Sequence, residues 1–318
     1  MRAAVLTGPA AMTVTEVARP EPGAGEVRVR LEGCGVCASN VEPYEGQSWS
    51  SFPGDAGGLG HEGWGVVDAV GEDVSQVRAG DRVAMLSGRS FAEYDIARAD
   101  ALVTLPESLA RRPFPGEPLG CAMNIFRRSD IRSGQTVAII GIGFLGAVLT
   151  RLATDAGARV IAVSRRQSSL DLARAFGAAE TVVMDDHWRI IADVKRVTGE
   201  ALCERVIEAV GKQWPLDLAG ELVGFGGKLV VAGYHQDGPR QVNMQEWNWK
   251  GIDVVNAHER DPAVALQGLR EAVDAIASGR IDLGPLLTHR YRLDEVAAAI
   301  EATRDKPDGF VKALVLYD

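Results

Sequence analysis

The sequence predicts an α/β protein in which a doubly wound parallel sheet is inserted into a β-rich lobe. Short strand-like segments separated by Gly, Pro and Asp fill residues 1 to about 115, where helical periodicity is scarce. Beyond that region, strand-like and helix-like segments alternate, which is typical of βαβ units and a parallel sheet. With 318 residues the chain is longer than one core usually organises, so two domains are expected.

The β-rich lobe is predicted from brief runs with the period of a strand. Alternation is clearest in EVRVRLEGCG at 26–35, and short hydrophobic runs follow at 63–71 and 80–86. A period of two is typical of a half-buried strand, because successive side chains point to opposite faces of a sheet. These runs are too short and too often interrupted to form helices of ordinary length.

The inserted region is predicted from four strands and the helices between them. Strands are expected at 135–141, 159–164, 204–210 and 227–233, and helices at 144–157 and 168–178. The C-terminal region reads as amphipathic helices at 265–279 and 293–304 and a final strand at 309–318. We expect this tail to fold back onto the first lobe. The predicted domains are therefore 1–119 with 257–318, and 120–256.

Charge and cysteine content limit the possible partners and the compartment. A formal charge of −9 argues against nucleic acid or an anionic membrane as a partner. Four cysteines are too few for a disulfide scaffold, and the first residues lack a basic segment followed by an apolar stretch. The apolar runs fall short of the roughly 20 residues that a membrane span needs. We expect a reduced, cytoplasmic protein.

A glycine-rich turn predicts a dinucleotide site. GIGFLG places Gly141, Gly143 and Gly146 after an apolar strand and at the start of a helix, with Phe144 and Leu145 between them. The first glycine allows the tight turn, the second lets the backbone approach a pyrophosphate, and the third lets helix and strand pack closely. The alternative is a glycine-rich turn without a ligand.

The end of the next strand predicts which nicotinamide nucleotide binds. NAD sites usually carry an acidic residue about 20 positions after the glycines, but this sequence has Ser164, Arg165 and Arg166 there. A hydroxyl and guanidinium groups donate hydrogen bonds to a 2′-phosphate, whereas a carboxylate would repel it. NADP(H) is therefore expected. The alternative is that the arginines only face water at a helix start.

A metal site is predicted from residues on separate loops of the β-rich lobe. Cys37 lies in GCGVCASN, and His61 and Glu62 lie 24 residues further on in GHEGWG. Thiolate, imidazole and carboxylate form a catalytic zinc ligand set that leaves a position open for substrate. On a regular strand His61 and Glu62 would point to opposite faces, so both can approach one metal only if the backbone is irregular. The glycines on either side permit this.

Two cysteine questions accompany the metal site. Cys34 and Cys37 suggest a redox pair or half of a structural zinc site, but a redox pair needs exposed, pKa-tuned sulfurs and a structural site needs a second cysteine pair. Cys34 is therefore predicted to be buried. In GEPLGCAMN, Glu117 and Cys121 are four residues apart and would share a helix face. Either can complete the metal shell, and the alternative for Cys121 is a small buried residue.

Taken together, these motifs resemble the zinc-dependent alcohol dehydrogenase branch of the medium-chain dehydrogenase/reductase superfamily. The resemblance covers essentially the whole chain, through MRAAVL, GVCASN, GHEGWGVVDAVGEDV, GDRV, FAEY, GEPLGCA, GIGFLG, VIEAVG, NWKGID and GFVKALVLY. It implies a GroES-like catalytic domain, completed by the C-terminal segment, with an inserted Rossmann domain. It also implies reversible hydride transfer between NADP(H) and an alcohol or carbonyl compound.

The resemblance implies roles for particular residues of the metal site. Cys37 and His61 match zinc ligands, and Glu62 matches an acidic residue that is a direct or an alternate ligand. Glu117 stands 24 residues before the first glycine of the turn, as in the sorbitol dehydrogenase-like group, so it is favoured over Cys121. Ser39 matches the hydroxyl residue that passes the substrate proton to solvent.

Three departures from the family pattern change the expectations. The lobe with four closely spaced cysteines that holds a structural zinc in many relatives is missing, so one catalytic zinc and no structural zinc is expected. Asn40 replaces the usual aspartate that supports the zinc-binding histidine, and a neutral amide raises ligand basicity less than a carboxylate does. Glu42 falls near the end of the proton relay of some relatives and is expected to face water.

Further positions are implied along the cofactor and the substrate. By family position, 208–211 (including Val210), 231–234 (including Gly233), Asn256 and Lys312 lie near the cofactor, with Lys312 at the phosphates. A substrate pocket lined by aromatic and histidine side chains is one interpretation, and burial in the core is the other; these are Trp49, Phe52, Trp64 and His258.

The expected substrate is a small secondary alcohol, ketone or aldehyde, with polyols suggested by the EPL motif. Relatives are usually dimers or tetramers, so a homodimer or homotetramer is expected. Two rival functions are a zinc-free quinone or enoyl reductase of the same superfamily and a non-enzymatic NADPH-binding sensor. Neither rival needs Cys37 and His61, and the sensor has no use for Ser39.

Overall fold

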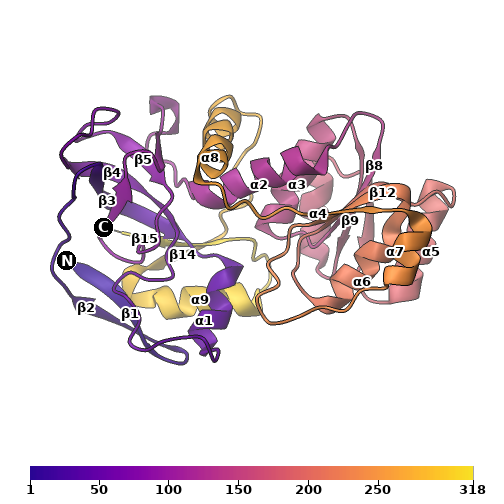
Figure 1. Ribbon diagram of the computed structural model, residues 1–318, viewed down its shortest axis with the longest axis horizontal. Helices are drawn as coiled ribbons and strands as arrows, with labels where there is room; N and C mark the ends of the chain where they lie inside the picture. The colour runs from indigo at the N-terminus through magenta and orange to yellow at the C-terminus, as the bar shows by residue number, and fades with distance from the viewer. Residues whose placement is uncertain (318) are drawn as a thin grey trace. The chain divides into compact units, whose positions relative to one another are not determined.

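The chain forms two compact units in the computed structural model, which describes residues 1–317 (Figure 1). The first unit comprises Met1–Gly120 and the C-terminal segment that begins at Asp261, and the second comprises Cys121–Arg260. Asp318, the last residue of the predicted final strand, lies outside the described residues. The boundary near residue 120 falls inside one helix, α2 (Gly116–Ser129).

The second unit is built on a six-stranded sheet whose paired strands are all parallel. In spatial order its strands are β10 (Glu180–Val183), β9 (Arg159–Ser164), β8 (Thr136–Ile140), β11 (Cys203–Glu208), β12 (Val223–Val231) and β13 (Asp253–Asn256). The chain moves outward from β8 to β10 and then returns to start β11 beside β8. This reversal between β8 and β11 is the switch point at which doubly wound sheets bind their ligands.

Helices cover both faces of this sheet. On one face α3 (Phe144–Asp155) contacts α4 (Gln167–Ala175), and on the other α5 (His187–Thr198) contacts α6 (Gln213–Leu222) (Figure 1). A shorter helix, α7 (Met244–Lys250), packs against β12. The neighbours Ile139 and Ile140 are both fully buried although their side chains point to opposite faces, which requires cover on both sides. Apolar runs in these strands therefore mark a parallel sheet.

The first unit contains a seven-stranded sheet and a two-stranded sheet. The larger sheet has the order β14 (His289–Arg292), β15 (Ala313–Leu316), β3 (Glu26–Gly35), β4 (Glu62–Val70), β5 (Arg82–Met85) and β7 (Leu102–Thr104), with β6 (Tyr94–Arg98) paired to β3. β1 (Arg2–Gly8) pairs with β2 (Ala11–Glu16). Because β15 pairs with β3, the last strand of the chain completes a sheet begun by its first residues.

Short helices and two longer ones complete the first unit. The 3₁₀ turn η1 (Ala38–Asn40) and helix α1 (Val41–Glu45) follow β3, and η2 (Glu107–Leu109) follows β7. Helix α8 (Pro262–Ala277) begins at an Asp261 cap, and η3 (Leu293–Glu295) leads into α9 (Val296–Asp305). Strand β3 ends two residues before Cys37, so the metal-site segment begins where the sheet stops. No helix within residues 1–317 is long and apolar enough to span a membrane.

Candidate metal centre and dinucleotide site

Cys37, His61 and Glu62 lie together in the first unit. One ligand atom of each lies within 4.8 Å of the others, and no other group of this kind is found among residues 1–317. Cys37 caps η1, and Glu62 is the first residue of β4. His61 precedes the strand, so its side chain is not bound to the alternation that would turn it away from Glu62.

The orientation of His61 is set by a backbone carbonyl. Its Nδ1 lies 2.8 Å from the oxygen of Leu59, and because a carbonyl only accepts, Nδ1 carries a proton; in the neutral imidazole, the form that binds a metal, Nε2 is then the acceptor. Asn40 donates from Nδ2 to the same oxygen at 2.8 Å, and its Oδ1 accepts from the Cys37 N–H at 3.0 Å. The buried amide therefore joins the two loops that carry the metal donors, and it supports His61 through Leu59.

Glu62 is fully buried and has one strong partner. The Lys312 ammonium, itself 5% exposed, lies 2.5 Å from Oε1, whereas Oε2 has no hydrogen-bond partner among residues 1–317. A side chain at Gly35 would place its Cβ 1.9 Å from Oε2, so only glycine leaves room for this carboxylate. The structure shows the Lys312 ammonium in a buried ion pair, and the expectation that Lys312 lies near the cofactor phosphates stays a prediction.

The charges around His61 show that this site favours a cation. Burial lowers the pKa of His61, but the hydrogen bond and charge of Cys37, together with Glu117 and Glu62, outweigh burial and raise it to about 10. The thiol, the imidazole and the Glu62 carboxylate, one oxygen of which has no partner among residues 1–317, form the mixed sulfur, nitrogen and oxygen donor set that zinc prefers. Residues and electrostatics therefore fit a bound zinc ion.

Other residues predicted for this region have different environments. Cys34 is buried as predicted, and desolvation raises the pKa of its thiol well above the usual value. Cys121 is exposed on α2, so the interpretation of it as a small buried residue is wrong. Ser39 is half-buried on η1, and Glu42 is half-buried and accepts a hydrogen bond from Gln47 at 2.7 Å.

The predicted pocket-lining aromatic residues divide between core and surface. Trp64 is 1% exposed and packs beneath Gly33, where a Cβ would come within 2.5 Å of its ring, so the interpretation of Trp64 as a pocket residue is wrong. Trp49 and Phe52 are exposed, which leaves them available to a ligand. His258, in the second unit, is half-buried and its ring meets that of Tyr234 edge-on.

The glycine-rich turn has the geometry that the sequence predicts. Gly141 follows β8 with φ of 96°, a left-handed conformation that favours glycine, and a Cβ there would meet Val210 at 2.4 Å. A Cβ at Gly146 would lie 2.0 Å from the Gly141 oxygen, whereas one at Gly143 would meet nothing within 4 Å. Gly143 caps α3, so the open space lies at a helix N-terminus, where an anion is stabilised.

The residues next to this turn differ in exposure. The Phe144 side chain is buried in α3 and Leu145 is half-buried, so Phe144 can offer a ligand only its backbone. Ser164 ends β9 and is 7% exposed, Arg165 is exposed, and Arg166 caps α4. Burial and the charge of Arg165 lower the pKa of Arg166. A cationic surface therefore lies at the carboxyl end of β9.

The loops after β11, β12 and β13 hold the remaining predicted cofactor residues. Val210 is exposed, Gly233 is buried, and Asn256 is exposed with its Oδ1 accepting from the His258 N–H at 3.1 Å. From the sequence, Glu208 was included only as a member of the segment 208–211 and was assigned no role of its own. Its signal was a carboxylate at the end of an apolar strand, and the structure buries it completely among backbone N–H groups.

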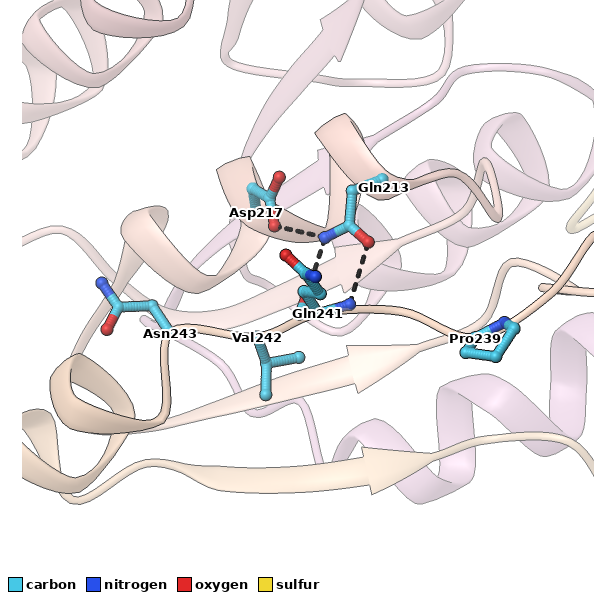
Figure 2. Close-up of a pocket in the computed structure, with 6 residues that line it drawn as sticks. All are labelled: Gln213, Asp217, Pro239, Gln241, Val242 and Asn243. Carbon is cyan, nitrogen blue, oxygen red and sulfur yellow. Dashed lines mark hydrogen bonds between the residues drawn. The ribbon is translucent and has the colours of Figure 1, made fainter.

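A surface hollow of about 560 Å³ also lies in the second unit (Figure 2). It is formed between α6 and the segment before α7, and its lining is Gln213, Asp217, Pro239, Gln241, Val242 and Asn243. None of the predicted site residues lines it. The hollow therefore reflects how this segment is attached to α6 and is not part of the candidate sites.

Comparisons with known proteins agree with the fold. Residues 23–107 match the alcohol dehydrogenase GroES-like domain, and residues 145–277 match the zinc-binding dehydrogenase family. An alcohol dehydrogenase of Geobacillus stearothermophilus is 31% identical over 255 residues, which cover 70% of this chain and 74% of the relative. Sorbitol dehydrogenase of Gallus gallus is 27% identical over 326 residues, which cover 90% and 88%.

The solved structures extend this agreement to three dimensions. A dehydrogenase from Sinorhizobium meliloti 1021, solved with NADP bound, superimposes with a TM-score of 0.86 at 26% identity, and the match covers 99% of this chain and 98% of that one. The two family models, the parallel sheet and the similar solved structure therefore indicate the same fold. The chain belongs to the zinc-type alcohol dehydrogenase family of the medium-chain dehydrogenase/reductase superfamily, and it is an oxidoreductase of that family.

Proposed function

We propose that the protein is a zinc-dependent, NADP(H)-preferring alcohol dehydrogenase or carbonyl reductase. The observation that carries this proposal is the cluster of Cys37, His61 and Glu62, with one ligand atom of each within 4.8 Å of the others and with Glu62 Oε2 buried and unpartnered among residues 1–317. A buried carboxylate oxygen without a partner is costly, and a metal ion at this point removes the cost. The neighbouring thiol and imidazole are ligands of zinc.

One catalytic zinc would be held by these three residues, with Glu117 as the further carboxylate. Glu117 is half-buried on α2 and its charge acts on His61, which supports it as a participant. Zinc bound here would act as a Lewis acid on the substrate oxygen. We propose no structural zinc, because the sequence has four cysteines and one of them, Cys37, belongs to the catalytic site.

Residues around the proposed zinc position its ligands and move the substrate proton. Leu59 holds His61 with Nε2 as the acceptor, and Asn40 keeps the Cys37 loop beside it. Bound NADP⁺ would supply the hydride acceptor for alcohol oxidation, and NADPH the hydride donor for carbonyl reduction. Ser39 is proposed to take the hydroxyl proton during oxidation and pass it to solvent, and to return a proton to the carbonyl oxygen during reduction.

The NADP(H) preference rests on the end of β9. Ser164, Arg165 and Arg166 offer a hydroxyl and two guanidinium groups where an NAD site has a carboxylate. The dehydrogenase from Sinorhizobium meliloti was solved with NADP. Comparison of kcat/KM for NADPH and NADH measures the preference, and an Arg166→Glu variant should move it toward NADH. A wild-type preference for NADH would overturn this part of the proposal.

The substrate class is proposed to be secondary alcohols with their ketones, or aldehydes with their primary alcohols. Because a sorbitol dehydrogenase is among the relatives, polyols should be the first substrates tested. The panel should be run in both directions with NADP(H), alongside metal analysis of the purified protein. Zinc well below one equivalent per chain, with full activity after chelation, would contradict the mechanism and favour a zinc-free reductase.

A Ser39→Ala variant separates an enzyme from a cofactor sensor. For an enzyme, turnover falls while NADPH binding, measured by nicotinamide fluorescence, stays unchanged. A protein that binds NADPH but turns over none of the panel, with or without Ser39, would favour the sensor. Relatives lead us to propose a homodimer or homotetramer, which sedimentation measures directly.

A further inference from the structure

A buried carboxylate connects two loops at the ligand-binding edge of the parallel sheet. Glu208 is the last residue of β11, and the loop that follows β12 begins at Ala232. Both strands lie on the β11 side of the switch point. In the proposed dinucleotide site the glycine turn after β8 would bind the pyrophosphate and the end of β9 the adenosine ribose, so the β11 and β12 loops would meet the nicotinamide half.

Glu208 uses both carboxylate oxygens to hold these loops. Oε1 accepts from the N–H groups of Val210 at 2.7 Å and Gly211 at 2.8 Å, and Oε2 lies 3.0 Å from Nε2 of His235. The backbone oxygen of Glu208 also accepts from the Gly233 N–H at 2.8 Å. The side chain is fully buried, so its charge is stabilised by these donors. One residue thus binds both loops.

The hydrogen bonds allow only one tautomer of His235. Arg240 Nε, which can only donate, lies 2.8 Å from Nδ1, so Nδ1 must be the acceptor. The single proton of the neutral imidazole is then on Nε2, which donates to Oε2 of Glu208. A second proton on Nδ1 would place two donors face to face. The contacts of the two ring nitrogens therefore fix the tautomer of His235.

The guanidinium of Arg240 closes the ring of contacts. Its Nη2 donates to the oxygen of Gly211 at 3.0 Å and also pairs with Asp237. Asp237 accepts from Lys212 at 2.9 Å, and these hydrogen bonds, that from Lys212 first, lower the pKa of Asp237 to about 2. The β12 loop is therefore bonded back to the β11 loop at several points.

The backbones of the two loops touch at a pair of glycines. A Cβ at Gly233 would lie 2.1 Å from the Gly211 nitrogen, and a Cβ at Gly211 would lie 2.7 Å from the Tyr234 oxygen. Such close approach means that a change in one loop moves the other. Val210 and Tyr234 remain exposed at this edge, where a ligand can reach them.

We propose that Glu208, His235 and Arg240 form a positioning clamp that holds the two loops on which the nicotinamide half of the cofactor rests. The inference rests on the proposed dinucleotide function and adds to it three residues that act through the loops. It predicts that the clamp contributes to binding of the nicotinamide half and not of the adenosine half. The carboxylate, imidazole and guanidinium act as one unit, so removing any one of them should have much of the effect of removing all.

The test compares two probes, NADPH and 2′,5′-ADP, which contains only the adenosine half. His235→Phe removes both hydrogen bonds and keeps a planar ring of similar size. We expect the Kd for NADPH to rise about tenfold while the Kd for 2′,5′-ADP changes less than twofold. Arg240→Gln should give a smaller rise, and the double variant should bind NADPH no more weakly than His235→Phe alone.

A matched control loosens the same loop at its far end. Gln213 on α6 accepts from the Gln241 N–H at 3.0 Å and donates to the Gln241 oxygen at 2.7 Å (Figure 2). Gln213→Ala removes this pair without touching the clamp, so it should leave both dissociation constants within twofold of the wild type. A tenfold effect of Gln213→Ala on NADPH would mean that any loosening of the loop suffices, and the clamp would be refuted.

Direct observation of the tautomer keeps the inference testable if a variant folds poorly. The chain has five histidines, so the imidazole nitrogens of His235 can be assigned in ¹⁵N NMR spectra by comparison with a His235 variant. We expect Nε2 protonated and Nδ1 unprotonated near neutral pH. Protonation at Nδ1, or equal weakening of NADPH and 2′,5′-ADP by His235→Phe, would overturn the clamp. Wild-type protein that binds neither probe would overturn the proposed function instead.

Discussion

Replacement by alanine should have different effects at two glycines of one turn: at Gly146 it should lower stability, and at Gly143 it should weaken cofactor binding. At Gly146 an added Cβ would lie 2.0 Å from the backbone oxygen of Gly141, whereas at Gly143 it would meet nothing within 4 Å. Real Cβ atoms essentially never come closer than 3.0 Å to another heavy atom, so Gly146→Ala must move α3 away from β8 by about 1 Å. Gly143→Ala requires no movement of the protein.

The magnitudes follow from these distances. Overpacking costs typically about 1–3 kcal/mol, and a displacement of backbone against backbone belongs at the upper end. Alanine gains at most about 1 kcal/mol over glycine in a helix, so Gly146→Ala should lose about 2 kcal/mol of unfolding free energy. Gly143→Ala should change stability by less than about 0.5 kcal/mol. Its methyl group instead fills the space at the N-terminus of α3 where a pyrophosphate would bind, so the Kd for NADPH should rise at least tenfold.

Urea unfolding and NADPH titration of the two variants check these values. Metal-free protein should be used for unfolding, so that ligand binding does not add to the measured free energy. Gly143→Ala that binds NADPH as tightly as the wild type would refute the open space as a pyrophosphate site. Gly146→Ala with wild-type stability would refute the packing argument. A loss of stability in both variants, with equal loss of binding, would also count against separate roles.

Three further substitutions test contacts within each of the two units. Asn40→Asp cannot donate to the Leu59 oxygen, so zinc affinity measured by chelator competition should fall about 10–100-fold, and unchanged or tighter binding would contradict the role of the amide. Lys312→Met leaves Glu62 buried without its cation and should lower the unfolding free energy of metal-free protein by about 3–5 kcal/mol; the double variant with Glu62→Gln should recover most of it. Burial and a hydrogen bond to the α7 carboxylate raise the pKa of Glu221 to about 7, so its protonation stabilises the fold at pH 4.5 and this contribution is lost as the pH rises to about 7. Glutamine resembles the protonated carboxyl, so the Tm of Glu221→Gln should be close to that of the wild type at pH 4.5, and the wild type should fall below the variant as the pH rises to about 7. A constant difference would show that Glu221 does not titrate there.

The parallel sheet was predictable where apolar runs reveal it, and was missed where they do not. Strand β9 was placed correctly at 159–164 because four apolar residues, all buried, follow one another there. β12 begins at Val223, four residues before the predicted start, because the glycines of VGFGG weaken the apolar pattern. Helix α5 was not predicted at all, since its buried residues share their turns with arginines and lysines and only the three-dimensional sheet shows which face is covered.

The candidate site was predictable to the extent that chemistry restricts residue type. Thiol, imidazole and carboxylate at family spacing identified Cys37, His61 and Glu62, and the structure brings these three together. The family resemblance implied that Lys312 lies near the cofactor phosphates. It gave no sign of the ion pair with Glu62, which lies 250 positions earlier in the chain. Whether it also meets a cofactor phosphate stays a prediction.

Buried polar side chains that join loops escape sequence reasoning for a common physical reason. Asn40 connects the Cys37 N–H to the Leu59 oxygen, and Glu208 connects the N–H groups of the β11 loop to His235. Irregular loops leave backbone groups without the partners that a helix or sheet supplies, and burial makes each such group costly. An apolar side chain cannot satisfy them, so a loop that must present its backbone or a donor atom in one fixed position needs a polar residue behind it. Which polar residue is needed depends on donors and acceptors that come together only in the folded chain. Asn40 and Glu208 could therefore be identified as positioning residues only from their hydrogen bonds in the structure.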